Sequence, residues 1–246
     1  MCSKRRRGFY ELYVKRCFDI VCAIFVLLLF GWLYIIISVM VFIKLGRPIL
    51  FKQARPGIID SVTGKETIFA MYKFRSMTNE KDKKGNLLPD KMRLGKFGKM
   101  LRATSMDELP EIYNVLKGDM SFIGPRPQLV RDMVFMSNKQ RMRHTAKPGI
   151  SGLAQVRGRN AITWEDKIDW DLKYISNISF INDLRIVFET VRVAIIHQEG
   201  ITDGKNATAL DYGDALLETG KISKSEYEKK QKEAKRILEE FDKGNV

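Results

Sequence analysis

An uncharged apolar stretch near the amino terminus constrains this chain more than any other feature. It runs from Ile20 to Ile43 without a single charged residue. As one straight α-helix it would extend about 36 Å at 1.5 Å per residue, enough to cross the hydrocarbon core of a bilayer. It is too long for the apolar core of a cleaved signal peptide, and no small-residue cleavage motif follows it. The stretch therefore predicts a helix that enters a membrane.

Basic residues flank both ends of this apolar stretch. A cluster at residues 4–7 precedes it, and Lys44 and Arg47 follow it. Because basic residues beside membrane segments favour the cytoplasmic side, both ends favour the same side. A re-entrant hairpin that enters and leaves through one face satisfies this preference, whereas the alternative, a straight spanning helix, does not. Gly31 permits a bend near the middle, and Ser38 lies where its hydroxyl can donate to a freed carbonyl.

The charge of the chain points to phosphate-bearing partners. The formal net charge is +14, and the excess lies before residue 201. Such an excess is typical of proteins that meet nucleic acid, anionic lipid or phosphorylated substrates. The three cysteines all lie near the amino terminus and form no disulfide framework, which fits a reducing compartment. Only two histidines are present, which argues against histidine-rich zinc centres and most Ser-His-Asp arrangements.

Strand patterns follow the apolar stretch. Residues 49–51 predict a brief strand, and Arg55-Pro56-Gly57 predicts the turn after it. Residues 67–75 predict a second strand, whose alternation places Lys73 and Arg75 on one face, about 6.5–7 Å apart. Two cations at that spacing suit the two phosphoryl groups of a diphosphate. The alternative is an ordinary solvated strand face.

Helical patterns dominate the rest of the body. Residues 94–102 predict a basic amphipathic helix that lies on an anionic membrane surface or packs on the core. Residues 153–156 predict a short strand. Two further helices are predicted over residues 164–175 and 182–197, the second capped by Asn182 or Asp183.

The composition changes beyond residue 200. Residues 210–218 and 223–241 predict two helices joined at Gly220. They resemble a short helix-pair module attached to the carboxyl ends of many bacterial proteins, and we interpret them as an appendage through which copies of the chain associate into a homo-oligomer.

The sequence as a whole predicts a helix-rich α+β fold. Its parts are an N-terminal re-entrant membrane helix hairpin, surface amphipathic helices, a small β element and a C-terminal helix pair. We expect three segments: a basic segment with the membrane helix over residues 1–47, a catalytic domain over 48–200, and a helical appendage over 201–246.

An acidic pair, Asp107-Glu108, opens the stretch SMDELPEIYNVLKGDMSFIGPRP at residues 105–127. Taken alone, the pair fits helix capping, with Ser105 and Glu108 as a capping box or Asp107 as the cap. The same placement has chemical consequences, because a helix amino terminus favours an ionised Asp107 and attracts phosphate. An ionised aspartate can attack phosphorus, and Glu108 offers the hard oxygen ligand that Mg²⁺ prefers.

Several long motifs, in order, resemble those of one family, the monotopic phosphoglycosyl transferases among the bacterial sugar transferases. The resemblance covers residues 14–199. The motifs that carry it are KRCFD, FKQARPG, YKFRSM, SMDELPEIYNVLKGDMSFIGPRP and KPGISGLAQVRGRN. Asp171 and Tyr174 also match family positions, without a role that we can assign to them.

The resemblance implies an activity at the cytoplasmic face of the bacterial inner membrane. Members of the family transfer a sugar phosphate from a UDP-sugar to polyprenyl (undecaprenyl) phosphate, which gives UMP and starts glycan assembly. By the same resemblance, Asp107 is the nucleophile of a covalent intermediate and Glu108 holds Mg²⁺. The motif cations, expected to bind substrate phosphates, are Lys73, Arg75, Arg126 and Arg159.

One departure from the family pattern concerns the membrane helix. The family breaks this helix at a Ser-Pro pair, where this chain has Gly31-Trp32. Proline removes a backbone donor and forces a kink, whereas glycine only permits one.

An alternative function is a membrane-anchored basic protein that binds nucleic acid or anionic lipid. It accounts for the charge and the apolar stretch, but not for the ordered Asp-Glu and Gly-Pro-Arg-Pro motifs. The sequence also has no aromatic RNA-binding strand motif and no clear recognition helix, so nucleic acid is not an expected partner.

Overall fold

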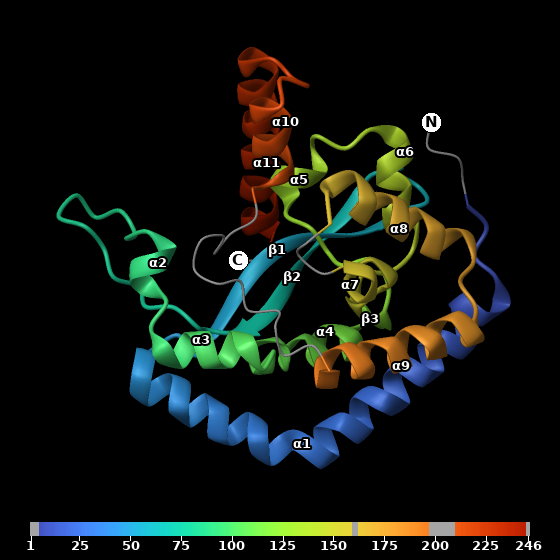
Figure 1. Ribbon diagram of the computed structural model, residues 1–246, viewed down its shortest axis with the longest axis horizontal. Helices are drawn as coiled ribbons and strands as arrows, with labels where there is room; N and C mark the ends of the chain where they lie inside the picture. Colours follow the sequence, from blue (N-terminus) through green and yellow to red (C-terminus); the bar gives the residue numbers. More distant parts are fainter. Residues whose placement is uncertain (1–4, 159–161, 197–209, 245–246) are drawn as a thin grey trace.

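The computed structural model describes residues 5–158, 162–196 and 210–244. Within these residues the fold is helix-rich α+β, as predicted, with two small sheets and a long apolar helix beneath the body (Figure 1).

The apolar stretch forms one continuous helix. A π-helical turn, η1 (Tyr10–Val14), leads directly into α1 (Lys15–Leu45). It is the one helix in the described part of the chain that is long and apolar enough to cross a bilayer. Figure 1 shows α1 as a wide V whose two ends turn toward the body. The helix stays unbroken through Gly31 and Trp32, so the tight hairpin is not shown.

Polar groups near the middle of α1 are satisfied locally. The indole N–H of Trp32 donates to the Leu29 carbonyl at 2.9 Å, and the Ser38 hydroxyl donates to the Tyr34 carbonyl at 2.8 Å. Ser38 donates to a carbonyl as expected, but it does so within an unbroken helix and not at a bend. Both bonds supply partners within the helix itself, which is what an apolar environment demands of polar groups.

The larger sheet is an antiparallel hairpin of β1 (Leu50–Ile59) and β2 (Glu66–Phe74). The second strand was predicted to within one residue. The predicted turn at Arg55-Pro56-Gly57 is wrong, because these residues continue β1. The pairing shifts register between Pro56 and Ile59, and such an irregularity tolerates a proline that cannot donate.

Three helices, α3, α4 (Glu111–Lys117) and α9 (Phe180–Ile196), lie in a row above α1 (Figure 1). The predicted helix near residue 97 is α3 (Lys96–Ala103), which follows the single turn α2 (Asp90–Arg93). Leu101 is buried in a core cluster with Phe74 and Val41 of α1, while Met100 is exposed. The prediction of an amphipathic helix is confirmed, and α3 packs on the core.

The centre of the body joins short elements. The second sheet pairs β3 (Ser121–Ile123) with β4 (Gly149–Ser151) in parallel. The remaining elements between residues 106 and 158 are η2 (Met106–Glu108), α4 (Glu111–Lys117), α5 (Val130–Met133), α6 (Asn138–Arg141), η3 (Met142–Thr145) and α7 (Leu153–Gly158). The predicted strand over residues 153–156 is wrong, since a short apolar run does not distinguish strand from helix.

Two longer helices complete the body. As predicted, α8 (Trp164–Ser176) begins after Thr163, whose hydroxyl oxygen accepts from the Asp166 amide. The next helix, α9 (Phe180–Ile196), starts earlier than expected. Asn182 and Asp183 therefore lie within its first turn and do not cap it. Asp183 is instead buried, where it accepts hydrogen bonds from Tyr10 and Tyr174, each at 2.8 Å.

The C-terminal helix pair is α10 (Tyr212–Glu218) and α11 (Lys224–Gly244), as predicted. Gly220 between them has φ +68°, a left-handed conformation that favours glycine. The pair packs against its own chain: Ala234 of α11 is buried among Val130 and Met133 of α5. The Tyr212 amide donates to the buried carboxylate of Asp132 at 2.9 Å. Homo-oligomerisation through this appendage stays a prediction, and it does not use this buried face.

We expect Ala234→Glu to detach α11 from α5. The substitution places a carboxylate with no cationic partner in an apolar contact, which costs at least about 2 kcal/mol. The melting temperature of the purified chain should fall by about 4–8 °C. Lys232→Glu introduces the same side chain at an exposed position of the same helix and serves as the control. An unchanged melting temperature in Ala234→Glu would contradict the packing of α11.

Candidate active site

Glu108 is the centre of a cluster of charged side chains drawn from three elements. Its Oε1 atom accepts from Lys73 Nζ of β2 at 2.6 Å and from Arg126 Nη2, beyond β3, at 2.5 Å. Burial opposes ionisation of Glu108, but Arg126 and Lys73 outweigh it and lower the pKa of Glu108 to about 2. Glu108 is therefore a firmly ionised carboxylate, and it gathers two of the cations predicted for the site.

Asp107 lies beside Glu108 in the short 3₁₀ turn η2, which precedes α4. Its side chain is buried, with 8% of the residue exposed. Burial raises the pKa of Asp107; the cation of Lys73 opposes that shift, the charge of Glu108 adds to it, and Arg102 opposes it. The predicted capping box is wrong. Ser105 adopts a left-handed conformation with φ 54° and caps nothing with its side chain, which leaves both carboxylates for the cluster.

A third carboxylate, Glu111, joins the cluster and was not predicted. It is the first residue of α4, is 2% exposed, and lies 3.1 Å from Lys73 Nζ through its Oε1 atom. Burial raises the pKa of Glu111, and the neighbouring charge of Glu108 raises it further. The sequence signal was its spacing, three residues after Glu108, which only helical geometry turns into proximity.

Two other arginines hold the backbone that carries Arg126. Arg143 donates to the Arg126 carbonyl at 2.7 Å, while its guanidinium is paired with the buried carboxylate of Asp171. Arg55 of β1 donates to the Pro127 carbonyl at 3.1 Å. Asp171, a residue without an assigned role in the sequence, therefore acts through Arg143 to fix the turn that presents Arg126.

The remaining predicted cations are placed differently. The guanidinium of Arg75 donates to the carbonyls of Gly46 and Arg47, at 2.9 and 2.8 Å, and also to that of Leu45. The structure thus brings Arg75 to the end of α1 and not to Glu108, and its role in phosphate binding stays a prediction. Arg159 lies outside the described residues.

The carboxylates fit a magnesium ion. Mg²⁺ binds one or two carboxylates and takes its other ligands from water and substrate phosphates. Glu108 is ionised, and the buried Glu111 Oε1 atom lies beside it, 3.1 Å from the same Lys73 Nζ. No group of three or more His, Cys, Asp or Glu side chains forms a complete metal site in the part of the chain that the structure describes. A metal here would therefore depend on substrate oxygens.

Comparison with known proteins assigns the chain to a family. The model of the family described as bacterial sugar transferase matches residues 10–197. This range covers most of the chain and includes every residue of the cluster described above. The chain therefore belongs to the bacterial sugar transferase family, a family of enzymes, and family membership sets aside the alternative of a purely binding protein.

Three relatives illustrate the similarity. The "Uncharacterized sugar transferase EpsL" of Bacillus subtilis is 47% identical over 80% of this chain and 95% of its own length. The "UDP-N-acetylgalactosamine-undecaprenyl-phosphate N-acetylgalactosaminephosphotransferase" of Aeromonas hydrophila is 38% identical over 74% of this chain. The "UDP-glucose:undecaprenyl-phosphate glucose-1-phosphate transferase" of Escherichia coli is 38% identical over 72%. The chain spans only 44% and 39% of the lengths of these last two relatives.

We expect Glu108 to contribute to the loss of stability in acid. Its folded pKa of about 2 lies below the ordinary value of 4.5, so its contribution is complete above pH 4.5 and is lost as the pH falls toward about 2. The contribution is at most about 3 kcal/mol. Urea unfolding between pH 5 and pH 3 should show a shallower loss in Glu108→Gln than in the parent chain. Glu80→Gln, at an exposed loop position, should keep the parental slope; equal slopes in all three proteins would contradict the ion-pair cluster.

Proposed function

We propose that this chain transfers a sugar phosphate from a UDP-sugar to undecaprenyl phosphate and releases UMP. The observation that carries the proposal is the Asp107-Glu108 pair, which lies among Lys73 and Arg126 just before α4, a helix that packs on the apolar α1. The names of the Aeromonas and Escherichia relatives describe this type of reaction, with N-acetylgalactosamine and glucose respectively. The identity of the sugar in this chain follows from neither name.

The reaction proceeds in two displacements at one phosphorus atom. A carboxylate oxygen of Asp107 attacks the phosphorus that bears the sugar, and the bond from that phosphorus to the bridging oxygen breaks, so UMP leaves. An oxygen of undecaprenyl phosphate then attacks the same phosphorus, and the acyl phosphate bond breaks. The Asp107 carboxylate is regenerated, and the product is an undecaprenyl diphosphosugar.

The charges around Asp107 suit this role. An anion that attacks an anionic diphosphate meets electrostatic repulsion, which neighbouring cations reduce. Lys73 lies close to both acidic residues and favours ionised Asp107, while Arg126 has the planar fork that binds phosphoryl oxygens in pairs. Glu108, with Glu111 beside it, would hold Mg²⁺, which supplies further neutralisation of phosphate charge when bound.

The hydrogen bonds between α1 and the body support re-entrant insertion from one face of the membrane, and the basic flanks of the apolar stretch favour the cytoplasmic face. At the first end, Arg16 donates to the Val115 and Leu116 carbonyls; at the other, Arg75 donates to Gly46 and Arg47. Because one polar body holds both ends, a straight span would have to carry that body across the bilayer. A shallow V in one leaflet avoids this and brings the lipid substrate to the site.

We expect the sugar phosphate to remain on Asp107 when lipid acceptor is withheld. The full chain, incubated with Mg²⁺ and a panel of labelled UDP-sugars, should release one burst of UMP and retain label for its cognate sugar. Asp107→Asn replaces the nucleophilic carboxylate by a neutral amide and should lose both, with turnover reduced by about 10³-fold or more. Intact-protein mass spectrometry and UMP release provide the measurements.

Asn138→Asp changes a polar residue of α6 and serves as a control that should keep the burst. A labelled adduct that survives in Asp107→Asn would remove Asp107 from the nucleophilic role. Continuous UMP release without lipid would instead indicate hydrolysis by water.

The re-entrant topology predicts that both flanks of α1 lie on one side of the membrane. Single cysteines at Gly8 and Lys52, in a chain whose three native cysteines are replaced by serine, should react with an impermeant maleimide from the same side of sealed vesicles. The reaction after detergent treatment controls for cysteine reactivity. Labelling of the two positions from opposite sides would establish a spanning helix.

A further inference from the structure

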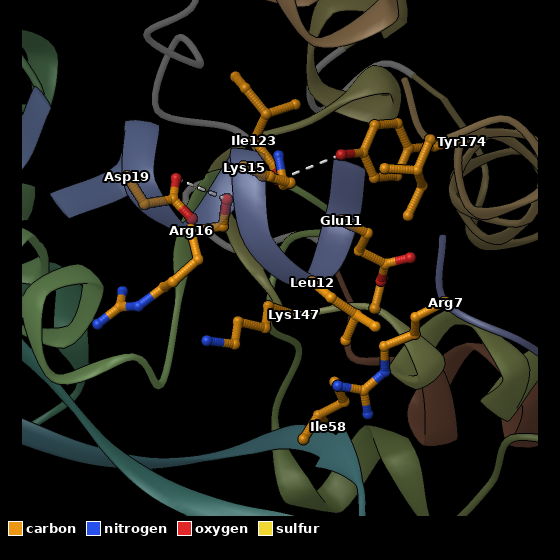
Figure 2. Close-up of a pocket in the computed structure, with 13 residues that line it drawn as sticks. Arg7, Glu11, Leu12, Lys15, Arg16, Asp19, Ile58, Ile123, Lys147 and Tyr174 are labelled. Atoms are coloured by element: carbon orange, nitrogen blue, oxygen red, sulfur yellow. Dashed lines mark hydrogen bonds between the residues drawn. The ribbon is translucent and has the colours of Figure 1, made fainter. Parts of the chain in front are cut away.

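A pocket lined by both charged and apolar side chains lies apart from the acidic cluster. It has a volume of about 180 Å³ and opens between the beginning of α1 and the segment before β4 (Figure 2). Helix α4 separates the two sites: Glu111 at its first residue belongs to the acidic cluster, whereas its last carbonyls accept from Arg16, which lines the pocket. At 1.5 Å per residue, α4 sets the two sites about 10 Å apart.

The acidic side chains that line this pocket already have partners. Glu11 pairs with Arg5 at 2.5 Å, and Asp19 accepts from the Ser121 hydroxyl and the Phe122 amide at 2.9 and 3.1 Å. Lys15, also in the lining, pairs with Asp183. Both carboxylates in the lining therefore already have partners within the protein.

Two cations in the lining have no such partners. Among the described residues, neither Arg7 nor Lys147 forms an ion pair or a side-chain hydrogen bond. Figure 2 shows both side chains at the lower part of the pocket, together with Arg16. Burial lowers the pKa of Lys147, and the charges of Arg16 and Arg7 lower it further against the opposing charge of Asp19. Positive charge without a partner in a half-enclosed space attracts an anion.

Apolar side chains surround the same region. Leu12 lines the pocket and is 45% exposed; Tyr13 beside it and Phe9, which immediately precedes η1, are more exposed still. Phe180 and Ile181 at the start of α9 are exposed as well, and the Phe180 ring contacts Tyr10 and Phe18. Exposed aromatic and aliphatic side chains beside cations are typical of the membrane–water interface.

We propose that this pocket binds the phosphate group of an anionic phospholipid, with Arg7 and Lys147 as its cationic ligands. The acyl chains lie over the exposed apolar side chains of η1 and α9. A free phosphate ion would satisfy the cations but would leave that apolar surface uncovered, so the lipid is the occupant that fits both features. The inference rests on the membrane association of α1, and it does not depend on the transfer reaction.

The test measures lipid binding to the full chain in a neutral detergent. Native mass spectrometry of the chain titrated with dioctanoyl phosphatidylglycerol should give one tight lipid adduct, and dioctanoyl phosphatidylcholine should bind more weakly. Lys147→Gln and Arg7→Gln should each weaken phosphatidylglycerol binding by about tenfold, since each removes a charge-assisted hydrogen bond. Lys147→Arg keeps the charge and should retain binding.

Lys99→Gln removes an exposed lysine of α3 and is the matched control for general electrostatic attraction. Intrinsic-fluorescence binding titrations in the same detergent compare the variants at low and raised salt. The effect of Lys99→Gln should vanish at raised salt, where exposed charges are screened, while that of Lys147→Gln persists. The melting temperature without lipid verifies folding, and Arg7→Gln maintains the test if Lys147→Gln does not fold.

Three outcomes would overturn the proposal. One is equal binding of the two lipids by the parent chain. Another is loss of binding in Lys99→Gln that matches the loss in Lys147→Gln at both salt concentrations. The third is competition by inorganic phosphate at the affinity of the lipid itself, which would make this a site for soluble phosphate.

Discussion

The attachment of both ends of one apolar helix to a single polar body governs the rest of this structure. At the first end of α1, Arg16 reaches the last carbonyls of α4, while Asp19 accepts from Ser121 and from the amide beside it. At the other end, Arg75 donates to the carbonyls that follow the helix. Such bonds are strong because one partner is charged and the surroundings are partly dry. Because these bonds fix α1 to the body, the depth of α1 in the membrane sets the distance of the acidic cluster from the membrane surface.

The acidic cluster is organised by a difference between neighbouring carboxylates. Glu108 has two cations against it and is ionised, whereas burial raises the pKa values of Asp107 and Glu111. One carboxylate thus anchors the cations while the adjacent one remains sheltered from water. Substrate phosphates that draw Lys73 and Arg126 away from Glu108 would leave the Glu108 carboxylate free to bind a metal. The two cations that pair with Glu108 without substrate would then bind the phosphates.

The sequence predicted the features that depend on short-range patterns. It did not predict where a side chain points in the folded protein or which distant segments it contacts. Strand β2 and helix α8 have clear periods and were predicted closely. Alternation placed Arg75 on the face of Lys73, but β2 ends at Phe74, and beyond the last pleat the alternation no longer sets direction. Nothing in the sequence marked Arg143, because its contact with the Arg126 carbonyl joins distant segments. The sequence drew attention to Asp107 and Glu108 because they are adjacent. It did not draw attention to Glu111, because Glu111 comes close to Glu108 only when the chain folds into η2 and α4.

Contacts on the turn of Arg126 and on the helix that follows it come both from inside and from outside the residues that match the family model. Arg143 and Arg55 hold its carbonyls, and both residues lie within the range that matches the family. The next element, α5, carries Asp132, which accepts from the Tyr212 amide, and α5 packs on Ala234. These last two residues lie beyond residue 197, where the family match ends. The C-terminal helices therefore pack, from outside the matched range, on the helix that follows the turn of Arg126.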